Sequence, residues 1–208
     1  MAVTPLAWAT PPEWVAAVAT DTLALLSDHA HCELKAASSA QALIAKNTQR
    51  PELISELLSI AHEELEHFGR VVAMIEARGG KLAPVSGNRY AGELLKRGAL
   101  GKSPHLLDRL LVAALIEARS LERFRLLADH LPDPELRELY ADLLSSEASH
   151  RAFFLDAAQS YYPAQFESEL ERFAELEATV IRELPFAHLI HSGPPARAPS
   201  EASPQGCA

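Results

Sequence analysis

The sequence has few cysteines, a deficit of positive charge and no long hydrophobic run. Its two cysteines, Cys32 and Cys207, form no CxxC or mixed Cys/His pattern, so neither a zinc ribbon nor a sulfur-ligated iron site is expected. No apolar run approaches the roughly 18 to 20 residues that a membrane span needs. Residues 1–12 also lack a basic stretch followed by an apolar one. These absences predict a cytoplasmic protein with no membrane partner.

The charge balance is acidic, with 28 Asp and Glu against 19 Lys and Arg and a net charge of -9. Such a balance argues against a general nucleic-acid binder, and we expect no DNA partner. Hydrophobic residues make up 48% of the 208 residues, enough for one domain with a sizeable core. We predict a single domain over residues 1–191 and a disordered tail over 192–208, which is rich in Pro, Ala and Ser.

Apolar residues recur at steps of three and four along most of the chain, which predicts helices. The breaks within two pairs of long helices are short, whereas the connection between the pairs, residues 79–104, is long and rich in glycine. This order is typical of an all-α, ferritin-like four-helix bundle with a long crossover between helical hairpins, plus extra N- and C-terminal helices. The long helices are predicted at about 21–46, 51–78, 104–130 and 134–161, and shorter ones at 11–19, capped by Thr10, 91–97 and 164–183.

Each long helix carries a glutamate, alone or with a histidine, in the middle of its apolar stripe. One such glutamate would most often be an edge residue in a salt bridge. A buried carboxylate costs several kcal/mol, however, and four that converge repel one another, so two divalent cations are expected to offset them. The histidines would complete the sites as neutral ligands. The predicted ligands are Glu33, Glu64, His67, Glu117, Glu147 and His150.

The spacing of these residues forms an internal repeat. Glu64-x-x-His67 and Glu147-x-x-His150 each place a glutamate and a histidine on one face of a helix. A stripe glutamate precedes the first motif by 31 positions and the second by 30, and the two histidines lie 83 positions apart. One Glu-x-x-His motif is weak evidence, but two matched hairpins strongly indicate the di-metal carboxylate pattern. The repeat also selects Glu64 over the neighbouring glutamates.

Carboxylate-rich sites with two histidines suit iron or manganese better than zinc or copper, and the residues leave these two metals open. A reduced iron pair can react with dioxygen, and three interpretations follow. The protein could insert oxygen into a bound substrate, or it could oxidise iron or break down peroxide like a ferritin or rubrerythrin. It could also be a catalytically silent helical scaffold.

Several segments resemble those of the bacterial tRNA hydroxylase family over about residues 5–185. The resemblance rests on the motifs at 29–35, 63–68, 116–124 and 146–150, on Pro12-Glu13-Trp14 and on the long crossover. The resemblance implies a non-haem di-iron monooxygenase that hydroxylates the isopentenyl group of 2-methylthio-N6-isopentenyladenosine in tRNA, next to the anticodon. It also implies that the six ligands act catalytically through two iron ions, with dioxygen as co-substrate. The chain has no flavin or iron–sulfur motif, so an external electron donor or reductase is expected.

A tRNA partner is unexpected for a chain with an acidic net charge, but the crossover is locally basic. Residues 79–104 contain five basic residues and one acidic residue, Glu93. A glycine-rich basic loop near the site could hold tRNA phosphates. The alternative is that these are ordinary solvated loop charges. The predicted tRNA contacts are Lys81, Arg89, Lys96, Arg97 and Lys102.

Overall fold

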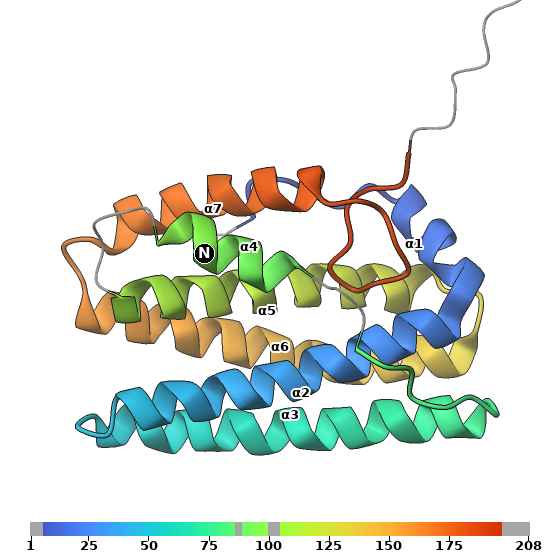
Figure 1. Cartoon of the computed structure of the whole chain (residues 1–208), viewed down its shortest axis with the longest axis horizontal. Coiled ribbons are helices and arrows are strands. Elements are labelled where there is room, and N and C mark those ends of the chain that lie inside the picture. Colours follow the sequence, from blue (N-terminus) through green and yellow to red (C-terminus); the bar gives the residue numbers. More distant parts are fainter. Residues whose placement is uncertain (1–5, 86–88, 100–104, 197–208) are drawn as a thin grey trace, which may run out of the picture.

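The computed structural model describes residues 6–85, 89–99 and 105–196, and in this part every regular element is a helix. Two helical hairpins lie side by side and form a four-helix bundle (Figure 1). The first hairpin joins α2 (Thr22–Lys46) to α3 (Pro51–Ala77), and the second joins α5 (His105–His130) to α6 (Pro134–Tyr161). The predicted all-α bundle of two hairpins is therefore confirmed.

Shorter helices cover one side and one end of this bundle. The crossover helix α4 (Tyr90–Gly98) and the C-terminal helix α7 (Phe166–Glu183) pack on α5 as an additional layer (Figure 1). Helix α1 (Glu13–Val18) and the short 3-10 helix η1 (Ala19–Asp21) lead into α2 at one end of the bundle. None of the helices in the described ranges is long and apolar enough to cross a membrane.

Local sequence signals set most helix ends within two residues of the predicted positions. The Asp133 side chain caps α6 by accepting hydrogen bonds from the backbone N–H groups of the next turn. Pro51 and Pro134 occupy first-turn positions, where a missing N–H costs nothing. Gly79 follows α3 with a φ of 69°, the left-handed conformation that favours glycine. The predicted cap of α1 is wrong, because the Thr10 hydroxyl instead donates to Glu122 Oε2 at 2.7 Å.

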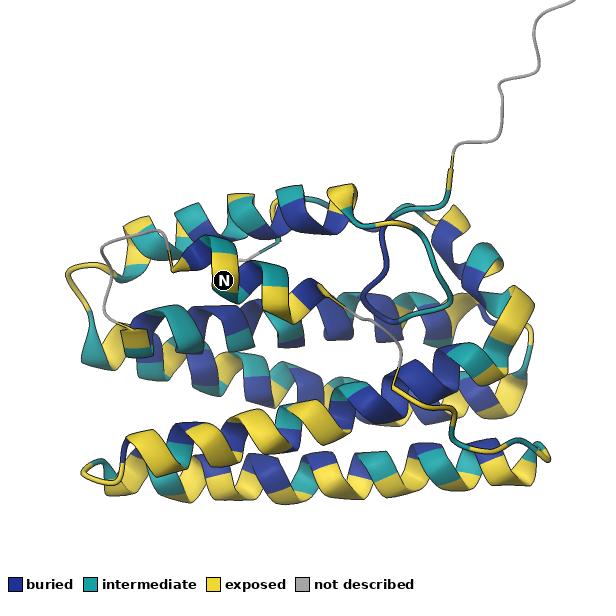
Figure 2. Cartoon of the chain, in the orientation of Figure 1, coloured by how far each residue is buried: buried dark blue, intermediate teal, exposed yellow. Residues whose placement is uncertain are grey.

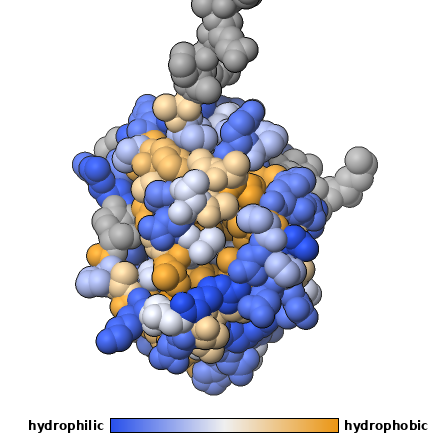
Figure 3. All heavy atoms as spheres, turned by 90° about the vertical axis from the view of Figure 1, so that its right-hand side faces the viewer, coloured by the Kyte–Doolittle hydropathy of each residue, from blue (hydrophilic) through white to orange (hydrophobic). Residues whose placement is uncertain are grey.

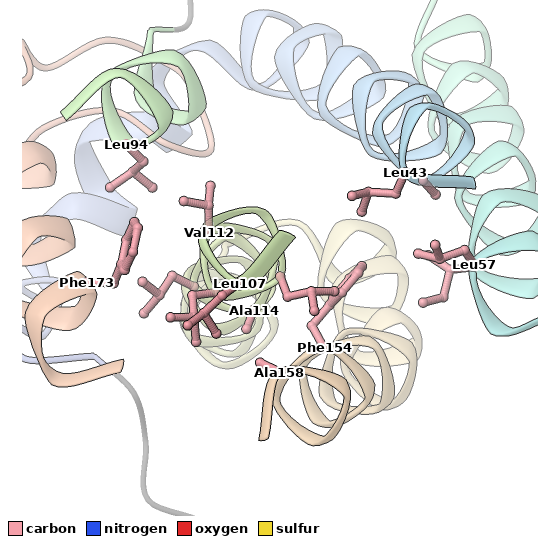
Figure 4. Packing of buried hydrophobic residues seen from close by; sticks show 14 of the residues in the cluster. Leu43, Leu57, Leu94, Leu107, Val112, Ala114, Phe154, Ala158 and Phe173 are labelled. Carbon is pink, nitrogen blue, oxygen red and sulfur yellow. The ribbon is translucent and has the colours of Figure 1, made fainter. Parts of the chain in front are cut away.

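The core consists of two apolar clusters, and the predicted ligands lie between them on every helix of the bundle. Buried residues face inward along all four helices, whereas the outer faces of α2 and α3 are exposed (Figure 2). In one cluster, Leu94 of α4 and Phe173 of α7 pack beside α5, and Phe154 of α6 points toward α2 and α3 (Figure 4). The apolar clusters on either side of the predicted ligands thus fix the position along the bundle axis at which these polar side chains meet.

The segment after α7 folds back against α1 and α5, at an end of the molecule whose surface mixes apolar and hydrophilic residues (Figures 1 and 3). Ser192 is 1% exposed, accepts a hydrogen bond from Trp14 Nε1 at 3.1 Å, and its carbonyl accepts one from Arg123 Nη2 at 2.8 Å. The folded part therefore includes Ser192 and Gly193, whose N–H donates to the Pro185 carbonyl, although the sequence predicts a tail from residue 192. Residues 197–208 of that predicted tail lie outside the described ranges.

Candidate metal centre

The bundle brings all six predicted ligands together in its interior, and none is more than 6% exposed. Their ligand atoms fall into two groups, and within each group the atoms lie within 4.8 Å of one another. Glu64 belongs to both groups, so it would contribute to holding both ions of a metal pair. The first group is Glu33, Glu64, His67 and Glu147, and the second is Glu64, Glu117 and His150.

Several ligand atoms are buried without a well-aligned hydrogen bond in the described part of the chain, although some lie close to one another. These atoms are Glu64 Oε2, His67 Nδ1 and His150 Nδ1. His67 Nδ1 lies 3.6 Å from Glu64 Oε2, and His150 Nδ1 lies 3.0 Å from Glu64 Oε1. A buried polar atom without a partner costs about 1–3 kcal/mol. Divalent cations between these atoms would remove that cost, so the residues fit a two-metal site.

Neighbouring side chains hold the ligands in place from outside the cluster. Glu63 Oε2 lies 3.1 Å from His150 Nε2, which leaves Nδ1 of the same ring directed at Glu64. His29 Nε2 lies 2.5 Å from Glu33 Oε1, and interaction with the Ser120 side chain lowers the pKa of Glu147 slightly against the effect of burial. Such outer partners orient metal ligands and tune their basicity. The sequence repeat could not find them, because they depend on how the helices face one another.

His29 is a neutral supporting residue and not a charged one. Burial, with a smaller contribution from His67, lowers its pKa to about 3. The ring stacks on Tyr140 and contacts Phe124, with centroid distances of 5.3 and 4.8 Å. When Glu33 is ionised, Nε2 of the neutral ring must carry the proton and donate it to the carboxylate.

The four carboxyl groups do not share one charge state when no metal is bound. Burial raises the pKa values of Glu33, Glu117 and Glu147, the last to about 8, and the charge of Glu64 acts in the same direction on each. Glu64 behaves oppositely: burial opposes its ionisation, but hydrogen bonding to Glu33 and to the two ligand histidines brings its pKa below the ordinary range. The metal-free centre therefore holds protons where a metal pair would supply positive charge.

The free energy of unfolding of the metal-free protein is expected to fall as the pH rises from about 6.5 to about 8. A group with a raised pKa in the fold stabilises it below the unfolded pKa, and this stabilisation is lost as the pH rises through the folded pKa. The pKa of Glu147 is about 8 in the fold against an ordinary value of 4.5. The pKa of His150 is raised from 6.5 to about 9, because its hydrogen bonds to Glu64 outweigh the effect of burial. Both groups therefore lose stabilisation in this pH window. Each contributes up to about 1.4 kcal/mol per pH unit.

Urea denaturation of the metal-free chain at both pH values measures this effect. Glu147→Gln should make the fall shallower, because the amide does not titrate. The metal-loaded protein should show no fall, because metal binding requires deprotonated ligands. A metal-free protein whose stability is constant or rises across this range would contradict the prediction.

An apolar pocket adjoins the centre. It contains about 850 Å³ of empty space, part of it open to solvent, and Glu117 forms part of its wall. Its walls come mainly from α2, α4 and α5, with Leu43 and Val112 among the apolar side chains (Figure 4), and Ile60 of α3 and Phe154 of α6 also line it. His191 also lines it and stacks on Tyr90 with ring centroids 4.7 Å apart. The sequence did not single out His191, because its position depends on the return of the C-terminal segment.

The predicted tRNA contacts do not form one cluster with the ligands. Lys81, Arg89 and Lys96 are exposed. Arg97 is engaged in ion pairs, with Glu93 at 3.1 Å and with Glu183 at 2.7 Å. The predicted contact Lys102 lies outside the described residues. The crossover nevertheless reaches the pocket, since Tyr90, Ala91 and Leu95 of α4 line its wall.

Comparisons with known proteins agree with this geometry. The family model described as tRNA-(MS2IO6A)-hydroxylase (MiaE) matches residues 2–192. A tRNA 2-(methylsulfanyl)-N(6)-isopentenyladenosine(37) hydroxylase from Pseudomonas putida is 42% identical over 84% of this chain and 83% of its own length. The protein of the same name from Salmonella typhimurium is 31% identical over 83% of this chain and 81% of its own. A solved structure, "Protein 43 with aldehyde deformylating oxygenase activity from Synechococcus", is 40% identical with a TM-score of 0.85, covering 91% of this chain and 96% of that one.

Proposed function

Because this chain belongs to the tRNA-(MS2IO6A)-hydroxylase (MiaE) family, we propose that it is a di-iron monooxygenase that modifies tRNA. Its substrate is 2-methylthio-N6-isopentenyladenosine in tRNA, and one carbon of the isopentenyl group is hydroxylated. The reaction consumes dioxygen, two electrons and two protons and yields the alcohol and water, so an external reductase supplies the electrons. The observation that carries the proposal is an apolar pocket whose wall includes a residue of the metal cluster.

The six clustered residues would hold the metal pair, with Glu64 placed to contact both ions. A bound iron pair supplies the redox chemistry that activates dioxygen for insertion into a C–H bond. Glu63 and His29 fix the orientations of His150 and Glu33 from outside the cluster. Carboxylate and imidazole ligands favour iron or manganese, and metal analysis of the purified protein distinguishes the two.

The pocket suits a short apolar group attached to a base. Most of its lining side chains are apolar, as in ordinary ligand pockets. Its apolar side chains would exclude water from an alkenyl group. Glu117 belongs both to the pocket wall and to the metal cluster, so the two lie next to each other. A base in an RNA loop can be splayed out to reach such a pocket, because loop bases are not held in a duplex.

Other functions account for less of this arrangement. Iron storage or peroxide breakdown has no use for an apolar pocket beside the metal cluster, and the curated relatives named above are hydroxylases. The activity named for the Synechococcus protein makes an aldehyde substrate the second candidate, because an apolar pocket can accept a hydrocarbon chain. Basic side chains around the pocket favour the polynucleotide.

The exposed crossover residues Lys81, Arg89 and Lys96 support tRNA binding in this proposal, since the same crossover contributes α4 to the wall of the pocket. Arg97 contributes less, because its charge is already paired with Glu93 and Glu183. Exposed positive charge on the crossover attracts the phosphate backbone whatever the RNA sequence.

A hydroxylation assay tests the function, and a pocket variant tests the place of reaction. Iron-loaded protein with isopentenylated tRNA, dioxygen and a reductant should yield a nucleoside that has gained one oxygen atom. Ala36→Phe fills the pocket from α2 and should lower kcat/KM by at least ~10-fold, the scale of a misplaced substrate. Ala45→Phe on the exposed side of the same helix is the control and should retain wild-type activity.

Iron content of both variants should equal that of the wild type. An iron-loaded wild type that produces no oxygenated nucleoside would contradict the function, and turnover of an aldehyde in its place would support the second candidate. Full activity of Ala36→Phe would show that the substrate does not use this pocket.

A further inference from the structure

A second hollow adjoins the apolar pocket and differs from it in character. It lies between the C-terminal turn of α2 and the N-terminal turn of α5 and contains about 630 Å³ of empty space, part of it open solvent. The two hollows share Ser39, Leu43 and Arg109 as wall residues. The two hollows therefore adjoin, and together they make up a depression lined by α2 and α5 that extends from the pocket beside Glu117 to the C-terminal end of α2.

The charge of this second hollow is positive. Lys46, His105 and Arg109 line it, and Lys35 lines the adjoining apolar pocket. No Asp or Glu is among the described residues of its wall, although the chain as a whole is acidic. Within the described ranges no salt bridge engages Lys46 or Arg109, whereas Arg70, Arg78, Arg97, Arg119 and Arg172 all have acidic partners. These basic groups are free to bind an anion.

The spacing along α5 matches the length of a substituted nucleotide. Arg109 lies eight residues before Glu117 on one continuous helix, which is about 12 Å along the axis at ~1.5 Å per residue. In a nucleotide with a five-carbon group on its base, about a dozen covalent bonds separate the outermost carbon from the phosphate, a reach of ~10–15 Å. With the alkenyl end beside Glu117, the phosphate would lie near Arg109.

We propose that Lys46, His105 and Arg109 form a phosphate subsite that holds the RNA backbone next to the base whose substituent occupies the apolar pocket. This inference rests on the proposed function, because RNA is taken as the occupant. The subsite is built from α2 and α5. It is separate from the crossover lysines, since neither Lys81 nor Lys96 lines the second hollow.

Binding of an anticodon stem–loop that carries the isopentenylated base tests the subsite over a range of salt concentrations, with the iron-loaded full chain. Lys46→Glu/Arg109→Glu should weaken binding by at least ~10-fold and reduce the slope of log K against log salt by about 0.7, the value for one lost phosphate contact. Arg125→Glu/Arg182→Glu makes the same charge change at exposed positions outside the depression and should leave affinity and slope at wild-type values. Lys81→Glu/Lys96→Glu reports on the crossover separately.

The outcomes separate the subsite from the proposed function. Hydroxylation of the RNA by the wild type, together with unchanged binding by Lys46→Glu/Arg109→Glu, would overturn the subsite and leave the function standing. Weaker binding with an unchanged salt slope would also overturn it, because lost phosphate contacts must lower the slope. An equal effect in Arg125→Glu/Arg182→Glu would overturn it as well, since overall charge would then explain the change. A wild type that hydroxylates no RNA would defeat the proposed function itself.

Discussion

Glu64→Ala is expected to abolish retention of the metal pair and to lower hydroxylation by more than ~100-fold. This loss exceeds the ~10- to 100-fold that follows when a side chain hydrogen-bonded to a metal ligand is removed. The reason is position: Glu64 belongs to both groups of ligand atoms, whereas every other ligand belongs to one. It is also the carboxyl whose pKa lies below the ordinary range, so it is ionised before any metal arrives. Metal content by mass spectrometry and the metal-dependent rise in Tm measure the loss.

Glu66→Ala is the matched control, two positions away on the exposed face of the same helix, and should keep both ions and full activity. Glu63→Ala should fall between them, with metal affinity lowered ~10- to 100-fold, because it removes only the carboxylate beside His150 Nε2. A Glu64→Ala protein that retains two ions per chain would show that the cluster is not held as its geometry indicates.

The meeting of the six glutamate and histidine side chains in the core could be predicted from sequence because its signal is local and repeated. Glu64 and His67 share a helix face by their spacing alone, and the second hairpin repeats that spacing around Glu147. Apolar stripes then require these faces to meet in the core, since each helix must bury its stripe. No contact between distant segments has to be known to place these residues together.

Residues that act through contacts between distant segments could not be found in this way. Thr10 was expected to cap the helix that follows it, but it bonds to Glu122, 112 positions away. Ser192 was assigned to a tail because its neighbours are small residues and prolines, yet Arg123 and Trp14 bind it in the interior. Composition describes a segment's average tendency, whereas one buried arginine with carbonyl partners can hold a polar segment in place.

The largest loss of stability outside the metal cluster is expected from Arg119→Leu. Arg119 and Glu177 are both fully buried, and the guanidinium donates to both carboxylate oxygens, with Nε at 2.9 Å and Nη2 at 2.7 Å. The same guanidinium donates to the carbonyl of Trp8, and Tyr90 donates to Glu177 at 2.7 Å. One pair thus joins α5, α7, α4 and the N-terminal segment. Removing one partner of a buried pair leaves an uncompensated charge, which costs about 3–5 kcal/mol.

Urea denaturation of the metal-loaded chain measures this cost against a surface pair of the same type. Arg70→Ala breaks the pair with Asp142, whose side chains are 44% and 57% exposed, and should cost no more than about 1 kcal/mol. Arg119→Leu/Glu177→Leu should be more stable than Arg119→Leu alone, because it removes the stranded carboxylate along with its partner. If the double variant is as unstable as the sum of the two single variants, the pair is not coupled and α7 is held to α5 by apolar packing alone.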